Sequence, residues 1–205
     1  MVSERTVEMG AAEVTVDHVD REPLIYKGAP CFDYMVDIET TGTIPDHAAI
    51  IQIAAVRFNR HTKEIDTSSF FDRALVMPSD RYWSESTREW WMTMPNVIKP
   101  ILARAEPPEL VMQAFQDWVL DGPGIEPRAF WGKPITFDYM FLNSYFRKYG
   151  IENPFHFREC IDLNSYIAGR GHADRRKFWA GIEKVGDAHN ALHDCFYQIR
   201  AVFNA

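Results

Sequence analysis

The sequence predicts an α/β domain in which helices flank a mixed sheet. Two observations support this prediction: three β-rich runs occupy the first part of the chain, and helical patterns interleaved with one or two short strands follow them. A chain of 205 residues is long enough to form one core unaided. Because 46% of the residues are hydrophobic and 14% are aromatic, the composition excludes a disordered or low-complexity protein.

The three β-rich runs cover residues 32–39, 48–58 and 65–71, and polar turn residues separate them. Each run is short and rich in β-branched or aromatic side chains. We expect the three runs to pair as an antiparallel meander.

Helical patterns dominate the rest of the chain. Proline, serine or acidic residues stand where several of these patterns begin, and Gly150 and Gly169 stand where two of them end. Residues 170–177 are rich in basic side chains and break the pattern. The predicted helices cover residues 84–94, a short segment starting after Pro95 or Asn96, and residues 109–120, 137–149, 160–168 and 188–203, with a short buried strand at 128–132.

The N-terminal region differs from the rest in composition. Residues 1–30 show no clear period, although a short strand is expected at 14–16, so we expect an acidic N-terminal arm followed by one domain over residues 31–205. The net charge is 22 − 29 = −7, and residues 1–22 of the arm carry −4 of it. A negative total argues against global attraction to phosphate, but it is compatible with a site where carboxylates hold cations that in turn hold phosphate.

The three cysteines, Cys31, Cys160 and Cys195, are widely spaced and odd in number. This pattern suggests neither a disulfide framework nor a zinc site, and it favours a reducing cytoplasm. No apolar run approaches the ~20 residues that a membrane span needs, so we expect no membrane association.

The first candidate site residues are Asp37 and Glu39. Alternation along the strand places both carboxylates on one face while Ile38 points into the core. Close carboxylates among apolar neighbours repel unless a cation lies between them, so the pair indicates a divalent metal site. Taken alone, Asp-x-Glu is more often a solvated strand end; the tight turn Thr40-Thr41-Gly42 that follows favours a site.

The second candidate is Asp138, which follows the strand at 128–132 and begins a helix. An isolated Asp there is usually explained by its interaction with the helix dipole. Only its combination with the other carboxylates indicates a metal ligand.

The third candidate is the segment from His189 to Asp194. Residues five apart on a helix point about 140° away from each other, so the two side chains converge only if His189 lies at or before the first turn. His189 would then be placed to take a proton from water and Asp194 to bind a metal. The alternative is a capping or surface histidine, and we interpret His193 as a surface or supporting residue.

Together these residues resemble a known family. Asp37-x-Glu39, Phe137-Asp138 and His189-x-Ala191-x-x-Asp194, in this order and on these elements, are similar to the three motifs of the DnaQ-like (DEDDh) 3′-5′ exonucleases, over about residues 32–203. The resemblance implies a ribonuclease H-like fold. Further similarity to the branch containing phage exonuclease A and a mycobacterial exoribonuclease is carried by Thr87-x-x-Trp90-Trp91, Trp131-Gly132 and Asp162.

One departure from the family stands beside the second motif. This chain has Lys133-Pro134 where the family commonly has an Asn-Gly type pair. Any contact made by that Asn is therefore lost or replaced by Lys133.

The resemblance implies a two-metal mechanism with Mg²⁺ or Mn²⁺ ions about 4 Å apart around the scissile phosphate. Asp37 would bridge both ions, and His189 would be the general base. Glu39, Asp138 and Asp194 would complete the two coordination shells.

The resemblance also implies substrate contacts. The terminal nucleotide is expected over the Thr40-Thr41-Gly42 turn and against Phe137. Trp90 and Trp91 lie about 100° apart on a helix, so one is expected in the core while the other offers a face for base stacking. Arg175, Arg176 and Lys177 are expected either to hold backbone phosphates or to form an ordinary solvated loop.

The expected partner is the 3′ end of a single-stranded nucleic acid, with DNA favoured, and the expected products are nucleoside monophosphates. One alternative is an exoribonuclease or oligoribonuclease, and another is an inactive nucleic-acid-binding module on the same fold. Competent residues at all five catalytic positions argue against the inactive module. The sequence leaves open whether the chain acts as a homodimer, and the expected compartment is the cytoplasm, of the host if the chain is viral.

Overall fold

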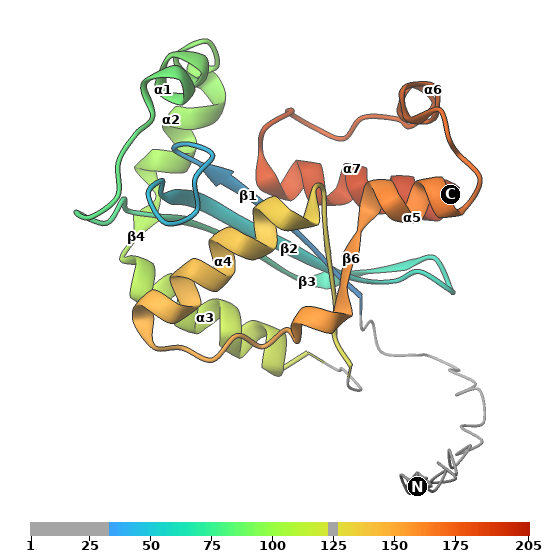
Figure 1. Cartoon of the computed structure of the whole chain (residues 1–205), viewed down its shortest axis with the longest axis horizontal. Helices are drawn as coiled ribbons and strands as arrows, with labels where there is room; N and C mark the ends of the chain where they lie inside the picture. The colour runs from blue at the N-terminus through green and yellow to red at the C-terminus, as the bar shows by residue number, and fades with distance from the viewer. Residues whose placement is uncertain (1–32, 123–126) are drawn as a thin grey trace, which may run out of the picture.

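The computed structural model describes residues 33–122 and 127–205 (Figure 1). The described chain forms one six-stranded sheet with helices on both faces. The strands are β1 (Asp33–Thr40), β2 (Ile50–Asn59), β3 (Glu64–Leu75), β4 (Ala105–Glu106), β5 (Ala129–Gly132) and β6 (Cys160–Asp162). The α-helices are α1 (Glu85–Met92), α2 (Pro95–Ala103), α3 (Pro108–Leu120), α4 (Ile135–Tyr149), α5 (Leu163–Gly169), α6 (Arg175–Ala180) and α7 (Ala191–Asn204), with a short 3₁₀ turn at Phe157–Glu159.

The strand order is β4-β3-β2-β1-β5-β6. β1 pairs antiparallel with β2, and β2 pairs antiparallel with β3, which confirms the predicted meander. β5 is parallel to β1, and β6 is parallel to β5, which makes the sheet mixed. Because β1 and β5 run in the same direction, their carboxyl ends meet at one edge of the sheet, and loops leave from there.

Two cores lie on opposite faces of the sheet. On one face, side chains of α3 and α4 such as Phe115 and Phe141 pack against Val36 and Ile38 of β1. On the other face, side chains of α5 and α7 pack against Met35 of β1 and its neighbours on β2. All ten residues of β2 are buried, as expected for a central strand covered on both faces. Asp37 and Glu39 share the face of Met35, so they lie on the side that α7 covers.

The structure corrects three sequence-based expectations. The helix expected at 160–168 begins only at Leu163, because Cys160–Asp162 adds to the sheet as β6 and Asp162 caps the helix through the backbone N–H of Ser165. The basic segment contains a helix, α6, which is capped by Asp174. The last helix begins at Ala191 rather than 188, because the Asn190 side chain accepts hydrogen bonds from the first-turn amides.

The remaining helix predictions are close to the structure. Ser84, one of the two predicted caps, accepts from the N–H of Thr87 at the start of α1, and Gly150 ends α4 with a left-handed φ of 64°. The strand expected at 14–16 and the arm lie outside the described residues. No helix in the described part of the chain has the length and apolarity required to cross a bilayer.

Candidate active site

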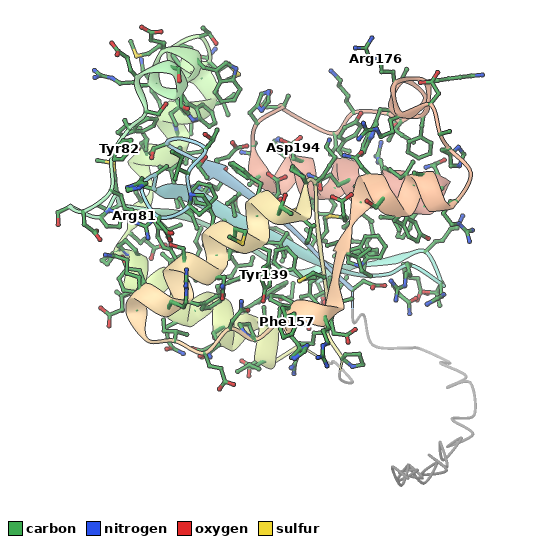
Figure 2. All side chains as sticks on the ribbon, viewed as in Figure 1. Arg81, Tyr82, Tyr139, Phe157, Arg176 and Asp194 are labelled. Atoms are coloured by element: carbon green, nitrogen blue, oxygen red, sulfur yellow. The ribbon has the colours of Figure 1, made fainter. Side chains whose placement is uncertain are left out.

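A cleft of about 370 Å³ lies at the edge of the sheet where β1 and β5 end. β1, the turn after β5, the first turn of α4 and the start of α7 all contribute to its walls. Figure 2 shows Asp194 near the N-terminal end of α7, beside the start of α4. The cleft is lined by Asp37, Ile38, Glu39, Lys133, Pro134, Phe137, Asp138, His189, Asp194 and Gln198.

Asp37 and Glu39 enter the cleft from β1, and Asp37 is supported by α7. The Gln198 side chain is 2% exposed, and its Nε2 donates to Asp37 Oδ1 at 2.6 Å. Gln198 follows Asp194 by four residues, so both side chains lie on one face of α7. This hydrogen bond fixes the orientation of one Asp37 oxygen.

Asp138 lies in the first turn of α4 and is only 2% exposed. Its Oδ1 accepts from the backbone N–H of Ile38 at 3.3 Å, which joins α4 to β1 between the two β1 acids. Its Oδ2 is buried and has no hydrogen-bond partner. A Cβ at Gly132 would stand 3.0 Å from that oxygen, so glycine at the end of β5 allows the close approach of the carboxylate.

His189 lies two residues before α7 and has a left-handed backbone, with φ of 63°. Its N–H donates to Asp194 Oδ2 at 2.9 Å, so His189 and Asp194 converge across the start of the helix, as the spacing requires. The preceding loop is held by His193, whose Nδ1 accepts from the N–H of Asp187 at 2.9 Å. Possible ligand atoms of Glu39, His189 and Asp194 all lie within 4.8 Å of one another.

The four carboxylates form what we call the carboxylate cluster: Asp37, Glu39, Asp138 and Asp194. Burial is the main cause that raises the pKa of Asp37 and Glu39 well above the ordinary value, and repulsion within the cluster raises both further. Burial also raises the pKa of Asp138 to about 7, against the opposing effect of the backbone N–H groups of Ile38 and Lys133. Burial raises the pKa of Asp194 as well, although the hydrogen bond from His189 opposes it.

Asp33, a buried acid elsewhere on β1, has hydrogen-bond donors and an arginine beside its carboxylate. Asp33 is 0% exposed, accepts hydrogen bonds from Trp131 Nε1 and the N–H of Arg60, and lies 3.6 Å from the Arg60 guanidinium. Within residues 33–122 and 127–205, by contrast, no Lys or Arg forms an ion pair with the carboxylate cluster. Four carboxylates that offer hard oxygen donors, an unpaired buried oxygen and a shortage of positive charge would fit divalent cations such as Mg²⁺ or Mn²⁺.

The Thr40-Thr41-Gly42 turn is fixed by internal hydrogen bonds. Thr40 Oγ1 donates to the carbonyl of Gly42, and Thr41 Oγ1 donates to the carbonyl of Tyr82 while accepting from the N–H of Ala49. Both hydroxyl groups thus have partners in the backbone of the turn or of neighbouring segments, and none of the three residues lines the cleft. A role in substrate binding would fall to the backbone of this turn.

The two tryptophans of α1 have different environments. Trp91 is 2% exposed, and its Nε1 donates to the carbonyl of Thr40 at 3.0 Å, so it supports the turn from the core. Trp90 is 41% exposed, and its ring meets the His189 ring edge-on, with centroids 4.7 Å apart. The sequence predicted that one ring would be buried and that the other would offer a face for base stacking. Trp91 is the buried ring, and Trp90 is the exposed one.

The other predicted substrate contacts lie around the cleft. Phe137 lines it and is half-buried. Arg175 lines a neighbouring pocket of about 280 Å³ that shares Pro134 with the cleft. Arg176 is exposed on α6, at the periphery of the molecule (Figure 2).

Sequence reasoning missed two supporting side chains. The position of Gln198 could have been predicted, because it follows Asp194 by four residues on a helix and so lies on the same face. Gln52 has no such signal in the sequence: it is fully buried on β2 and opposite Glu39, where its Oε1 accepts from the N–H of Ala191 and its Nε2 donates to Asp72. Gln52 thereby joins the start of α7 to the sheet.

Solved structures have the same architecture. The nuclease domain of 3′hExo, a DEDDh family member bound to rAMP, matches with a TM-score of 0.67 at 18% identity, covering 86% of this chain and 92% of that one. Cell-death related nuclease 4 (CRN-4) matches with a TM-score of 0.65 at 19% identity, covering 84% of this chain and 62% of CRN-4. These likenesses confirm the ribonuclease H-like fold.

The mixed sheet and the cluster of four carboxylates beside a histidine define the DEDDh class of 3′-5′ exonucleases. The model of one family in this class, described as the 3′-5′ exoribonuclease Rv2179c-like domain, matches residues 32–205, and the chain belongs to that family. The 3′-5′ DNA exonuclease Cap18 of Escherichia coli is 29% identical over 171 residues, which are 80% of this chain and 85% of Cap18.

Proposed function

We propose that this protein hydrolyses phosphodiester bonds one nucleotide at a time from the 3′ end of single-stranded nucleic acid, with DNA favoured, and releases nucleoside monophosphates. The observation that carries the proposal is the carboxylate cluster, in which acids from β1, α4 and α7 converge beside His189. No Lys or Arg among the described residues forms an ion pair with these acids. The likeness to Cap18 supports DNA as the substrate.

Each acid has a defined role in this proposal. Asp37 and Glu39 on the sheet face, with Asp138 and Asp194 opposite, would hold two divalent cations, Mg²⁺ or Mn²⁺. Such cations would supply charge neutralisation at the phosphate and would lower the pKa of bound water. Gln198 holds Asp37 in one orientation, and the N–H of Ile38 does the same for Asp138.

His189 is the proposed general base. Its side chain is exposed at the rim of the cleft, while its backbone is tied to Asp194, so the imidazole can reach a water beside the scissile phosphate and take its proton. The Trp90 ring limits the rotation of the imidazole by direct contact. The other face of Trp90 is the proposed platform for the terminal base.

The second candidate function is an exoribonuclease. It is favoured by the description of the family, which names an exoribonuclease domain. The fold and the carboxylate cluster serve either substrate, because the chemistry at the phosphate is the same; discrimination depends on contacts to the 2′-hydroxyl.

The test uses DNA and RNA strands of one sequence, labelled at the 5′ end, with Mg²⁺ or Mn²⁺. We expect a ladder of products shortened from the 3′ end, faster for DNA, and none with a chelator. In the Asp37→Asn variant the rate should fall at least about 10³-fold, because the cluster loses a shared ligand.

The matched control is Asp66→Asn, which removes an acid on the distant strand β3 whose partner is Arg57. Its rate should stay within about threefold of the wild type, because Asp66 lies on β3 and does not line the cleft. Shortening from the 5′ end, or full activity of the Asp37→Asn protein, would rule out the proposed function.

A further inference from the structure

Lys133 lies at the mouth of the cleft, in the turn between β5 and α4. It is half-buried, and it is the sole lysine or arginine among the described residues that line this cleft. Lys133 lines the same cleft as Asp138 and Asp194, and its positive charge opposes the rise in their pKa that burial causes. Neither carboxylate is within ion-pair distance of it, so its charge is available to another group.

Aromatic rings of two helices hold the Lys133 side chain. Its Nζ lies 4.1 Å from the centroid of the Trp179 ring on α6 and 5.9 Å from that of Tyr197 on α7. Trp179 is itself anchored by two hydrogen bonds. Its ring Nε1 donates to Asn164 Oδ1 at 3.3 Å, and its backbone carbonyl accepts from the Tyr197 hydroxyl at 3.4 Å. The ammonium group is therefore fixed in place before any ligand arrives.

The position of Lys133 relative to Trp90 indicates the direction in which a bound strand would run through the cleft. α1 and α6 lie on opposite sides of the N-terminal end of α7 (Figure 1), with Trp90 on the first and Trp179 on the second. If the terminal nucleoside lies on the Trp90 side of the carboxylate cluster, the rest of the strand leaves on the Lys133 side. Arg175 comes next on that side, in the pocket that shares Pro134 with the cleft.

We propose that Lys133 binds the first phosphodiester on the 5′ side of the scissile one, and that Arg175 continues the same phosphate track. This inference rests on the proposed function. A lysine ammonium is a compact point charge suited to a phosphate, and it carries no information about the base. The contact would give this acidic protein local attraction for a strand.

The test measures binding of a 5′-labelled single strand by fluorescence anisotropy, with Ca²⁺ in place of the catalytic ion and intact strand verified after each reading. Lys133→Met keeps the apolar stem on Trp179 and removes the charge. We expect its Kd to rise about tenfold and the slope of log Kd against log salt concentration to fall by about 0.7, the value for one phosphate contact on a single strand. Lys63→Met, at the exposed β2–β3 turn, is the matched control and should bind as the wild type does.

A second arm identifies the phosphate. A strand with one neutral methylphosphonate at the linkage next to the scissile one should bind the wild type about tenfold more weakly, yet bind Lys133→Met no more weakly than the natural strand does. Equal losses in both proteins, or unchanged Kd in Lys133→Met, would overturn the inference. So would tighter Mn²⁺ binding by Lys133→Met with unchanged strand affinity, because Lys133 would then only balance the charge of the carboxylate cluster.

The two proposals fail differently. If the wild type shortens no strand from its 3′ end, the proposed function fails. If the wild type is active and Lys133→Met binds every strand as the wild type does, the function stands and the phosphate contact alone is wrong.

Discussion

At the scale of single residues, the site depends on how closely a carboxylate can approach a backbone. Asp138 is drawn against β5 so tightly that its Oδ2 would lie 3.0 Å from any Cβ at Gly132. That separation is shorter than normal packing allows, so a side chain at Gly132 must displace the carboxylate. Asp138 is also tied to the N–H of Ile38, so the displacement would be transmitted to β1.

We therefore predict that Gly132→Ala lowers Mn²⁺ affinity and kcat by about tenfold each, because a small displacement of Asp138, a proposed metal ligand, would have large effects. Titration calorimetry of the metal and steady-state kinetics check this. The matched control is Gly169→Ala at the end of α5, where a Cβ meets nothing within 4 Å. Unchanged metal affinity in Gly132→Ala, or an equal loss in Gly169→Ala, would show that the close approach does not matter.

The same scale explains which site residues the sequence could predict. Asp37, Glu39, Asp138, His189 and Asp194 belong to motifs with fixed spacing, and the structure brings all five to one cleft. The hydrogen-bond partners of individual side chains could not be predicted. The Thr40 hydroxyl, for example, bonds inside its own turn, while the Thr41 hydroxyl bonds to the carbonyl of Tyr82, a partner that only the folded chain brings near.

At the scale of elements, the loop of residues 181–190 determines where His189 stands. His193 on α7 holds this loop through the N–H of Asp187, and Gly186 lies against the same ring with a left-handed φ of 55°. A Cβ at Gly186 would stand 2.4 Å from His193 Nδ1. Any side chain there must therefore move the loop, the His193 ring, or both.

We predict that Gly186→Ala lowers kcat about tenfold beyond any loss of stability, because His189, the proposed general base, moves with the loop. Gly150→Ala at the end of α4 is the matched control: its φ is 64°, and a Cβ there meets nothing within 4 Å. Both variants should lose about 1–2 kcal/mol of stability from left-handed backbone strain, but Gly150→Ala should keep its kcat. Equal kcat in the two variants would contradict the role assigned to the loop.

The elements also show where sequence patterns stop being informative. Long periodic segments such as α3 and α4 were predicted within two residues of their bounds. β6 was mistaken for the first turn of a helix, because a three-residue strand has no period of its own and is defined by its pairing with β5. α6 was read as basic loop, because six residues provide less than two helical turns of pattern.

At the scale of the whole molecule, the carboxylate cluster couples stability to pH and to metal. Burial raises the pKa of Asp37, Glu39 and Asp138 above the ordinary values, with Asp138 at about 7. The folded protein therefore binds more protons than the unfolded chain does between about pH 4 and pH 7. The stability that these groups contribute is fully present below the unfolded pKa and is lost as the pH rises through the folded pKa.

Burial also raises the pKa of Asp33, outside the cluster, but exposed acids that pair with cations act in a different pH range. The Lys148 and Arg73 partners lower the pKa of Asp80 and Glu106, and stability from such groups is lost only as the pH falls below the ordinary carboxyl value. Between about pH 5 and pH 8 these acids remain ionised in both states. Any change in stability across that interval that responds to metal is thus assigned to the cluster.

We predict that the Tm of the metal-free protein falls as the pH rises from about 5 to 8, and that Mn²⁺ raises Tm more at the higher pH. The cause is one competition: protons and cations both relieve repulsion among the same oxygens, and cations can bind only where protons have left. Thermal unfolding followed by circular dichroism, with chelator or with Mn²⁺, checks both trends. In Asp37→Asn the fall should be smaller, since one charge is gone while Gln198 still packs against the side chain. A metal-free Tm that rises over this interval, or an effect of Mn²⁺ that is larger at pH 5, would mean that the four acids are not a buried, mutually repelling group.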